Sequence, residues 1–366
     1  MALPPVFVFG SLAYSPLRTA VLGCQWAGRR AKVERTAAFA DKYGRFAVTR
    51  QGDGPLGGIV IDLPDGEPRE RLEFYLAVMA QSPRQIDLEG TPALLYEGQS
   101  TSEINWVPPG WHDRWGQVLV EAAHEVLKLR GTSPPERIAT RLSQVLVQAA
   151  SRVRAAERRP ASLRHSAKPG DVVVERWHQP YAHFFAVEEL DLRFRRFDGS
   201  FSAPVNRATF MSGDAVTVLP YDPVRDRVLL IEQFRPGPYG RGDLNPWLLE
   251  AIAGRIDAGE TPEEAGRREA VEEASVAIDR MVPVGNYYPS PGAKTEYLYS
   301  YIGTADLPDA LSGGIGGVED EAEDIRSHLV PFDRLMELVR TGEAENGPLL
   351  LSALALERLR PDLRAA

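Results

Sequence analysis

The sequence predicts an α+β protein of two domains, and three observations support this expectation. The chain has 366 residues, more than one ordinary domain needs, and 43% of them are apolar, which is enough for packed cores. Short β-prone runs mixed with helical patterns fill both the front and the rear of the chain. Two amphipathic helical patterns separate them. We therefore expect an N-terminal domain over residues 1–110, a helical linker or brace over 111–164 and a C-terminal domain over 165–366.

Composition and charge exclude several classes of function. A net charge of −9 argues against general nucleic-acid binding, which needs basic faces. Cys24 is the only cysteine, so the chain forms no internal disulfide and no cysteine metal cluster, as suits a reducing cytoplasm. The N-terminus lacks the basic start and long apolar core of a secretory signal, and no apolar run is long enough to span a membrane. We expect a cytoplasmic protein without membrane partners.

The N-terminal domain opens with an apolar, β-prone run at residues 6–9 that ends in Gly10-Ser11-Leu12. This pattern predicts a buried strand followed by a glycine turn. Similar patterns predict a helix at 68–79 and strands at 37–39, 46–49, 58–63 and 92–96.

The run Phe9-Gly10-Ser11-Leu12 resembles the strand and turn that open the gamma-glutamyl cyclotransferase-like family, with phenylalanine in place of tyrosine. The resemblance implies a small β-barrel with helices, and a cavity for an acidic substrate at the backbone amides of Gly10, Ser11 and Leu12. A later glutamate is the acid/base in that family, but Leu76 stands in its place here. Losing a proton-transfer carboxylate lowers a rate by about 10²–10⁴. We expect the fold and keep cyclotransferase activity as an alternative; a turn that only closes a strand is the other interpretation.

The segment between the domains predicts two helices. Apolar residues recur on one helical face over residues 113–130 and again over 136–157, and a Gly-Thr-Ser-Pro-Pro run separates the two patterns. We expect a brace docked on the N-terminal domain or on a partner subunit. The arginine-rich run that follows is expected to be a solvated linker face.

The C-terminal domain begins with patterns of several strands. A meander with a turn at Asp198-Gly199 is predicted, and then a hairpin around Asp222-Pro223. The predicted strands are 172–179, 182–192, 203–211, 215–221 and 227–234, and a run at 247–253 leads into an acidic helix.

The functional prediction depends on residues 254–276. Thr261 followed by Pro262 predicts a helix start, since threonine caps the first turn and proline loses no hydrogen bond there. The helix then places Glu269, Glu272 and Glu273 on one side. Close carboxylates repel one another, so the cluster favours a bound cation, and magnesium takes oxygen ligands. The alternative is a solvated acidic helix face.

The same segment resembles the Nudix box, whose pattern is G-x5-E-x7-R-E-U-x-E-E-x-G-U, where U is aliphatic. The positions that match in register are Gly254, Glu260, Arg268, Glu269, Ala270, Glu272, Glu273 and Val276. Ala270 is small for an aliphatic position, and Ser275 stands where the family has the glycine of the turn after the helix. The resemblance implies an α/β/α sandwich with a mixed sheet over residues 165–366.

Four motifs in order resemble the ADP-ribose pyrophosphatase branch of that family. They are a Q-x-R strand at 233–235, a W-x-x-E strand at 247–250 before Ala253-Gly254, an S-P-G segment at 290–292, and an acidic loop at 319–325. This branch commonly forms homodimers in which strands before the box swap between subunits. The fusion of the two domains also resembles Nudix proteins associated with bacterial tellurite resistance.

The resemblance implies a role for each candidate site residue. The expected ligands of Mg²⁺, with Mn²⁺ as a substitute, are Ala253 through its carbonyl, Glu269, Glu272, Glu273 and Glu323. The expected catalytic residues are Glu321 as the base for the attacking water, Glu272, and Arg268, which pairs with Glu260 or the cluster. Arg235 and Glu250 are expected at the substrate, or alternatively form a structural ion pair. The loop 319–325 is alternatively a solvated acidic run.

One functional expectation follows from this resemblance. The protein is expected to hydrolyse the diphosphate bond of ADP-ribose or a related nucleoside diphosphate sugar, giving AMP and a sugar phosphate. Its partner is then a small nucleotide sugar, and the N-terminal domain binds a small molecule or serves assembly. The alternatives are a gamma-glutamyl cyclotransferase-type enzyme and a non-catalytic nucleotide sensor, each with an idle Nudix domain.

Overall fold

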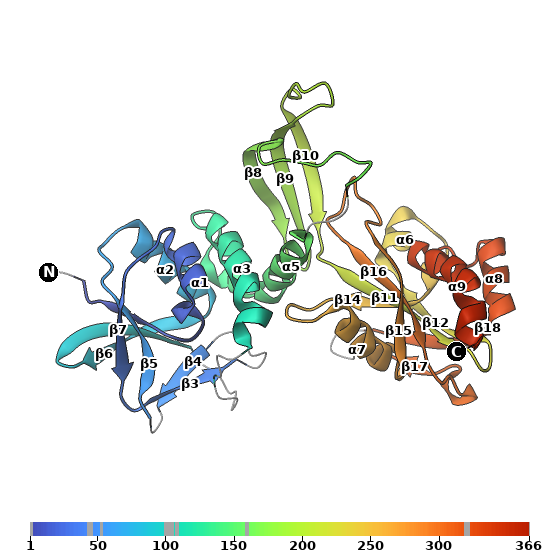
Figure 1. Ribbon diagram of the computed structural model, residues 1–366, viewed down its shortest axis with the longest axis horizontal. Coiled ribbons are helices and arrows are strands. Elements are labelled where there is room, and N and C mark those ends of the chain that lie inside the picture. Colours follow the sequence, from blue (N-terminus) through green and yellow to red (C-terminus); the bar gives the residue numbers. More distant parts are fainter. Residues whose placement is uncertain are drawn as a thin grey trace. The chain divides into compact units, whose positions relative to one another are not determined.

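The chain forms two compact units, Met1–His165 (unit 1) and Ser166–Ala366 (unit 2). Figure 1 draws the elements of each unit in a computed structural model. The structure describes residues 3–41, 47–51, 54–98, 106, 110–157, 161–317 and 323–365.

Unit 1 is built on a five-stranded sheet in the order β2-β5-β1-β7-β6, in which β1 runs parallel to β7 and antiparallel to β5. Its strands are β1 (Val6–Val8), β2 (Arg29–Val33), β5 (Leu56–Ile61), β6 (Gln81–Leu88) and β7 (Thr91–Gly98). A separate hairpin consists of β3 (Thr36–Ala40) and β4 (Ala47–Gln51). Among the described strands, β2 and β6 are the two edges of this sheet and do not pair with each other. The expected small barrel is therefore not confirmed.

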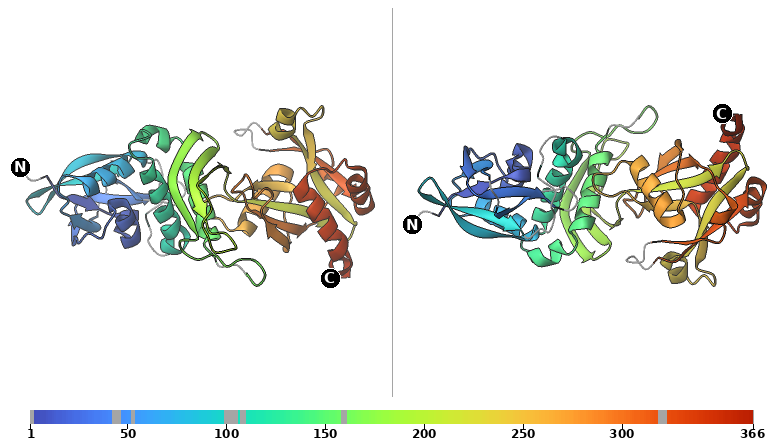
Figure 2. Two further views of the ribbon diagram at one scale, coloured as in Figure 1. Left: turned by 90° about the horizontal axis from the view of Figure 1, so that it is seen from above. Right: turned by 90° about the horizontal axis from the view of Figure 1, so that it is seen from below.

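The helices of unit 1 pack on one another beside this sheet, and both views of Figure 2 show them. They are η1 (Gly10–Ala13), α1 (Ser15–Leu22), α2 (Glu67–Val78), the π-type turn η2 (His112–Gly116), α3 (Gln117–Lys128), α4 (Pro135–Ala139) and α5 (Leu142–Ala155). The single helix expected over 136–157 is wrong, since α4 ends at Ala139 and α5 starts only at Leu142. The helix expected near 68–79 is confirmed by α2.

Unit 2 begins with a three-stranded antiparallel sheet in the order β10-β9-β8. Its strands are β8 (Val172–Ala182), β9 (Ala186–Phe194) and β10 (Val205–Met211). The strand expected from residue 182 starts later, at Ala186, because β8 continues to Ala182 and the chain then turns. In that turn the His183 N–H donates to the Phe185 carbonyl at 2.8 Å.

The larger sheet of unit 2 has eight strands and is mixed, because β11 runs parallel to β16 while its other pairs are antiparallel. Its main path is β15-β16-β11-β12-β18-β17, with β13 paired to β12 and β14 to β11. The strands are β11 (Ala215–Asp222), β12 (Arg227–Phe234), β13 (Trp247–Glu250), β14 (Ile252–Arg255), β15 (Arg280–Tyr287), β16 (Leu298–Thr304), β17 (Ile315–Gly316) and β18 (Ile325–Pro331).

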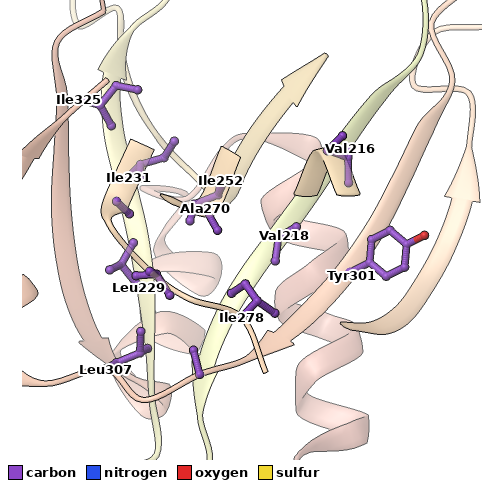
Figure 3. Packing of buried hydrophobic residues seen from close by; sticks show 14 of the residues in the cluster. Val216, Val218, Leu229, Ile231, Ile252, Ala270, Ile278, Tyr301, Leu307 and Ile325 are labelled. Carbon is purple, nitrogen blue, oxygen red and sulfur yellow. The ribbon is translucent and has the colours of Figure 1, made fainter. Parts of the chain in front are cut away.

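Helices cover both faces of this sheet. On one face lies α7 (Pro262–Ala274), and on the other lie α8 (Phe332–Thr341) and α9 (Gly347–Ala365). Shorter pieces are α6 (Pro236–Arg241) and η3 (Asp309–Leu311). Figure 3 shows the cluster on the α7 face, where Leu229 and Ile231 of β12 point towards Ala270. Their neighbours Val228 and Leu230 lie in the cluster of the opposite face, so β12 alternates between two environments.

No helix in the described ranges combines the length and the apolar character that a membrane crossing requires.

Candidate functional site

The site is built on α7, and local sequence fixes where this helix starts. The Thr261 hydroxyl accepts from the Glu264 N–H at 3.2 Å, and the Glu264 carboxylate accepts from the Thr261 N–H at 2.9 Å, which is a complete capping box. Pro262 occupies the first turn. The predicted start at Thr261-Pro262 is therefore confirmed. It sets the rotation of the helix and hence the direction of its later glutamates.

The carboxylates of α7 face different partners. Glu273 is 3% exposed and accepts a hydrogen bond from the Ala253 N–H of β14 at 3.2 Å. The Nη1 atom of Arg268 lies 2.7 Å from Glu269 Oε1 and 2.9 Å from Glu272 Oε2. Within the described residues, no three His, Cys, Asp or Glu side chains stand as a ready metal centre.

Burial leaves the charge of this cluster incompletely balanced. Desolvation, and then the charge of Glu269, raise the pKa of Glu273 to about 9. Desolvation also raises the pKa of Glu269 to about 7, although Arg268 opposes the shift. Both side chains therefore disfavour their ionised form until positive charge is added. The carboxylates of this cluster offer only oxygen atoms as donors, and the protein does not fully balance their negative charge. Both features fit a hard divalent cation.

Arg268 and Glu260 form the ion pair that the sequence analysis expected. Nε and Nη2 of Arg268 lie 2.9 and 3.0 Å from the two carboxylate oxygens of Glu260, and Nη2 also donates to the Arg255 carbonyl at 3.1 Å. One guanidinium thus ties the helix to the end of β14 while contacting two glutamates of the cluster. This forked geometry holds the side chain in one orientation.

Two glycines make room for the cluster. A Cβ atom on Gly254 would lie 1.9 Å from Glu269 Oε1, so the first residue of the box is the place where that carboxylate packs. A Cβ atom on Gly316 would lie 2.0 Å from the Glu273 carbonyl oxygen. The Gly317 N–H donates to the Glu272 carbonyl at 3.2 Å, so the glycine-rich strand β17 lies directly against the end of α7. The pattern gave the position of Gly254 but not this reason.

Arg235 and Glu250 form a forked ion pair, with Nε–Oε1 at 2.6 Å and Nη2–Oε2 at 3.0 Å. Burial lowers the pKa of Arg235, but the hydrogen bond and charge of Glu250, together with the charges of Glu273 and Glu323, leave it raised. The pair therefore lies within the field of the acidic cluster. The structural ion pair is present, and a role at the substrate stays a prediction.

Gln233 of β12 is the first residue of the Q-x-R motif, but the sequence predicted no role for it in the site. Its side chain is 6% exposed, and its Nε2 atom has no hydrogen-bond partner among the described residues. Because Gln233 follows Ile231 by two positions, it points to the α7 face. Only the tertiary structure reveals the buried amide, since the sequence shows merely a polar residue in a strand.

The acidic loop is described only at its end. Glu323 lies against Gly317, whose Cβ atom would be 2.8 Å from the Glu323 Cβ. Glu321, with residues 318–322 as a whole, lies outside the described residues.

The expected N-terminal cavity is small. Ser11 and Leu12 line a space of about 20 Å³ together with Leu76 and Tyr96, which is about the room of one water molecule. Gly10 precedes them at a φ of +57° and starts η1. Leu76 brings no carboxylate to this space. The nearby Glu73 is engaged elsewhere, because it lies 3.6 Å from Arg69 and accepts from the Tyr96 hydroxyl at 3.4 Å.

Comparison with known proteins matches the part of the chain that carries α7. A family model described as the NUDIX domain matches residues 211–352. The ADP-ribose pyrophosphatase of Escherichia coli (strain K12) is 38% identical over 202 residues, which are 55% of this chain and 94% of that protein. The ADP-ribose pyrophosphatase of Haemophilus influenzae is 34% identical over 169 residues, 46% of this chain and 77% of that protein. The GDP-mannose pyrophosphatase of Enterobacter sp. (strain 638) is 35% identical over 146 residues, 40% and 74% of the two chains.

The mixed sheet, the acidic helix and these matches define the class of the protein: the chain belongs to the Nudix family. Of the glutamates in the family pattern, Glu269, Glu272 and Glu273 lie on α7, and Glu260 lies just before it. The protein is a Nudix pyrophosphohydrolase.

Proposed function

We propose that unit 2 hydrolyses the diphosphate bond of ADP-ribose or a related nucleoside diphosphate sugar in a Mg²⁺-dependent reaction, with Mn²⁺ as a substitute. From ADP-ribose the products are AMP and ribose 5-phosphate. The names of the relatives, ADP-ribose pyrophosphatase and GDP-mannose pyrophosphatase, support this substrate class. The observation that carries the proposal is the geometry of α7, where Glu273 is 3% exposed and the Arg268 guanidinium lies between Glu269 and Glu272.

The metal would be held by oxygen atoms of this cluster, namely the carboxylates of Glu269, Glu272, Glu273 and Glu323 and the Ala253 carbonyl. When bound, a divalent cation neutralises phosphate oxygens and lowers the pKa of a bound water. Arg268 keeps Glu269 and Glu272 oriented while Glu260 holds the guanidinium from the other side. In this proposal Arg268 and Glu272 serve catalysis by holding that geometry.

The substrate would be held on the α7 face of β12 and β13. Arg235 offers its guanidinium to the diphosphate, since arginine forks bind phosphate oxygens in pairs. Glu250 fixes that guanidinium and contacts the nucleoside side of the substrate. Glu321 takes a proton from the attacking water as the new P–O bond forms and the bridging P–O bond breaks. The leaving phosphate remains paired with Arg235.

We also propose that the protein is a homodimer and that unit 1 has a small-molecule binding or assembly role. Exposed apolar side chains on β8 support the first part, because such residues on an edge strand favour pairing with another chain. They are Val172, Val174 and Tyr181, each at least 50% exposed. The F-G-S-L turn supports a gamma-glutamyl cyclotransferase-like origin of unit 1, while Leu76 weighs against cyclotransferase turnover there. The complete carboxylate set of α7 weighs against a purely sensory role.

The test is hydrolysis of ADP-ribose by the full-length protein, with AMP and ribose 5-phosphate measured by chromatography. Glu273→Gln is expected to lower kcat by on the order of 10³, because the metal supplies several kcal/mol of charge stabilisation. Glu263→Gln is the matched control, since Glu263 lies in the first turn of the same helix and its side chain, among the described residues, bonds only the Tyr301 hydroxyl, at 3.3 Å. Chelation of divalent ions is expected to stop turnover, and added Mg²⁺ or Mn²⁺ to restore it.

Three outcomes contradict the proposal. Unchanged turnover in Glu273→Gln removes the mechanism. Tight ADP-ribose binding without product favours the sensor. If the protein hydrolyses no nucleotide but releases product from a gamma-glutamyl substrate, and if this release persists in Glu273→Gln, the cyclotransferase is favoured. A parallel panel with GDP-mannose and other nucleoside diphosphate sugars ranks the substrates.

A further inference from the structure

The face of the large sheet opposite α7 carries a hollow of about 380 Å³ that the proposed reaction does not use. We propose that this hollow is a second ligand site, and that its ligand is a small organic cation rich in N–H donors with an apolar body. It lies within unit 2, between the ends of β12, β13 and β18 and the helix α8, whose place on the sheet Figure 1 shows.

Strand alternation separates the hollow from the acidic site. Glu232 continues the row of Val228 and Leu230, which face α8 and α9, while Gln233 and Arg235 face α7. On β13, Trp247 and Leu249 line the hollow, because they pair with Phe234 and Glu232. A ligand in the hollow is therefore on the other side of the sheet from Glu269 and Glu273.

The floor of the hollow is apolar and its size suits a small molecule. Leu249, Val330 and Leu338 line it, and Val330 and Leu338 are at most 9% exposed. Ligand sites are typically about 300–1,000 Å³, and the hollow falls in this range, although its lining as a whole is more polar than apolar. Trp247 forms one side with half of its surface exposed. An indole is the aromatic face that attracts a cation most strongly.

The polar groups of the hollow are mainly acceptors. His328 Nε2 lies 2.9 Å from Glu232 Oε2. In the neutral tautomer that donates this hydrogen bond, Nδ1 of the ring and Oε1 of Glu232 are left to accept from a ligand. Each side chain is about a third exposed, so a ligand can reach them.

The charge of the hollow favours a cation over an anion. Glu232, Glu343 and Glu345 line it against one arginine, Arg334. That arginine is already engaged, because its Nη1 atom lies 2.6 Å from Glu337 and its Nη2 atom 3.5 Å from Glu343. Within the described residues, Glu345 makes no side-chain hydrogen bond or ion pair, so a carboxylate at the rim stays available. A planar amidinium or guanidinium matches these acceptors and the indole face together.

The test compares two probes of the same shape, benzamidine, which is a cation, and benzamide, which is uncharged. Calorimetric titration uses the full-length protein with saturating Mg²⁺, so that cations at Glu269 and Glu273 do not contribute. Benzamidine is expected to bind at least about tenfold more tightly than benzamide, because charge-assisted hydrogen bonds are about twice as strong as neutral ones.

Variants then assign the site. Glu232→Gln is expected to bring the two probe affinities within about twofold of each other, and Trp247→Leu to weaken both probes. Glu357→Gln, an exposed carboxylate on α9 outside the hollow, is the matched control and is expected to keep the preference. Near-UV circular dichroism shows whether each variant folds. If Glu232→Gln fails to fold, Trp247→Leu alone assigns the site.

Three results overturn the proposal. One is equal affinity of the wild-type protein for the two probes. Another is a benzamidine preference that survives both Glu232→Gln and Trp247→Leu. The third is loss of benzamidine binding as Mg²⁺ rises, which assigns the cation to the acidic helix. Hydrolysis of ADP-ribose is measured separately, so failure of this site leaves the proposed reaction untouched, and failure of that reaction leaves the site untouched.

Discussion

Ser275 ends α7 in the left-handed conformation, at a φ of 55° and a ψ of 34°. Its N–H donates to the Val271 carbonyl and the Val276 N–H to the Ala270 carbonyl, both at 2.9 Å, so the usual helix-ending turn forms without glycine. Serine in place of the family glycine therefore strains the backbone of this turn. The carboxylates of α7 keep their positions.

Replacing Ser275 by glycine is expected to stabilise the protein by about 1 kcal/mol, because an L-residue in this conformation costs about 1–2 kcal/mol. Urea unfolding followed by circular dichroism measures the change. Ser275→Ala serves as the control, since alanine keeps the Cβ atom and is expected to give no gain. Equal stability of the serine and glycine forms would show that the turn is unstrained.

Gly254 permits a second test at the residue scale. Gly254→Ala is expected to lower kcat by about 10²-fold, since the new Cβ atom overlaps the Glu269 carboxylate and displaces it by about an ångström. Gly285→Ala is the control, because a Cβ atom there meets nothing within 4 Å. Steady-state hydrolysis of ADP-ribose measures both variants. If Gly254→Ala retains full kcat, the packing of Glu269 against this glycine has no part in turnover.

At the scale of elements, one aspartate in the turn between β11 and β12 anchors the C-terminal helix. Asp226 receives Arg360 Nε at 2.8 Å, Arg364 Nη1 at 2.8 Å and the Tyr221 hydroxyl at 2.8 Å. The hydrogen bond from Arg360 is the largest cause that holds the pKa of Asp226 well below its usual range. The helix α9 is thereby fixed to a strand far from it in sequence.

The contacts of Asp226 make the stability of the protein depend on pH, and the sign of this dependence can be derived. A carboxyl whose pKa is lowered by folding binds more protons when unfolded, so its stabilisation is present above a pH of about 4 and is lost as the pH falls further. Asp226→Asn is expected to cost roughly 1–3 kcal/mol at pH 7 and to flatten the loss of stability below pH ~4. Asparagine also tolerates the φ of 56° at this position.

Thermal unfolding from pH 2 to pH 7 measures this effect. Asp362→Asn, an exposed carboxylate on the same helix α9, is the control. A variant profile that runs parallel to that of the wild type would contradict the assignment to Asp226.

The elements themselves were unequally predictable from sequence. The helix α7 follows from Thr261, Pro262 and the periodic glutamates, because capping and dipole effects act within a few residues. The helix α6 is different: its sequence PGPYGR consists mainly of helix breakers, so its composition gives no signal for a helix. The break between α4 and α5 likewise follows no Gly or Pro signal.

The candidate site shows the same division. The pattern places Glu269, Glu272 and Glu273 on one side, because a helix fixes which side chains share a face. The partnership of Arg268 with Glu260, which precedes the helix, is implied by the family resemblance. The pattern does not reveal the buried amide of Gln233 or the contact of Glu232 with His328, because these depend on which strands become neighbours. Pairing of β12 with β18 brings Glu232 close to His328, and pairing of β12 with β13 sets Gln233 opposite Leu248.

At the scale of the whole molecule, unit 2 has hydrophobic cores of its own. Each face of its large sheet has one, and both consist only of residues after Ser166.

Residues 166–366 expressed alone are therefore expected to fold and to hydrolyse ADP-ribose with a kcat comparable to that of the full-length protein. Circular dichroism and the hydrolysis assay measure this, and residues 1–165 alone are the control, expected to release no AMP. Loss of activity in a well-folded fragment would mean that unit 1 takes part in turnover.

The alternation of β12 has a consequence for how this enzyme can change. Successive side chains of the strand point to opposite faces of the sheet. Deleting a single amino acid there would therefore turn the carboxylate of Glu232 to the α7 face and the amide of Gln233 to the opposite face. A substitution can change the side chains on one face of the sheet alone, whereas a change of length in this strand alters both faces at once.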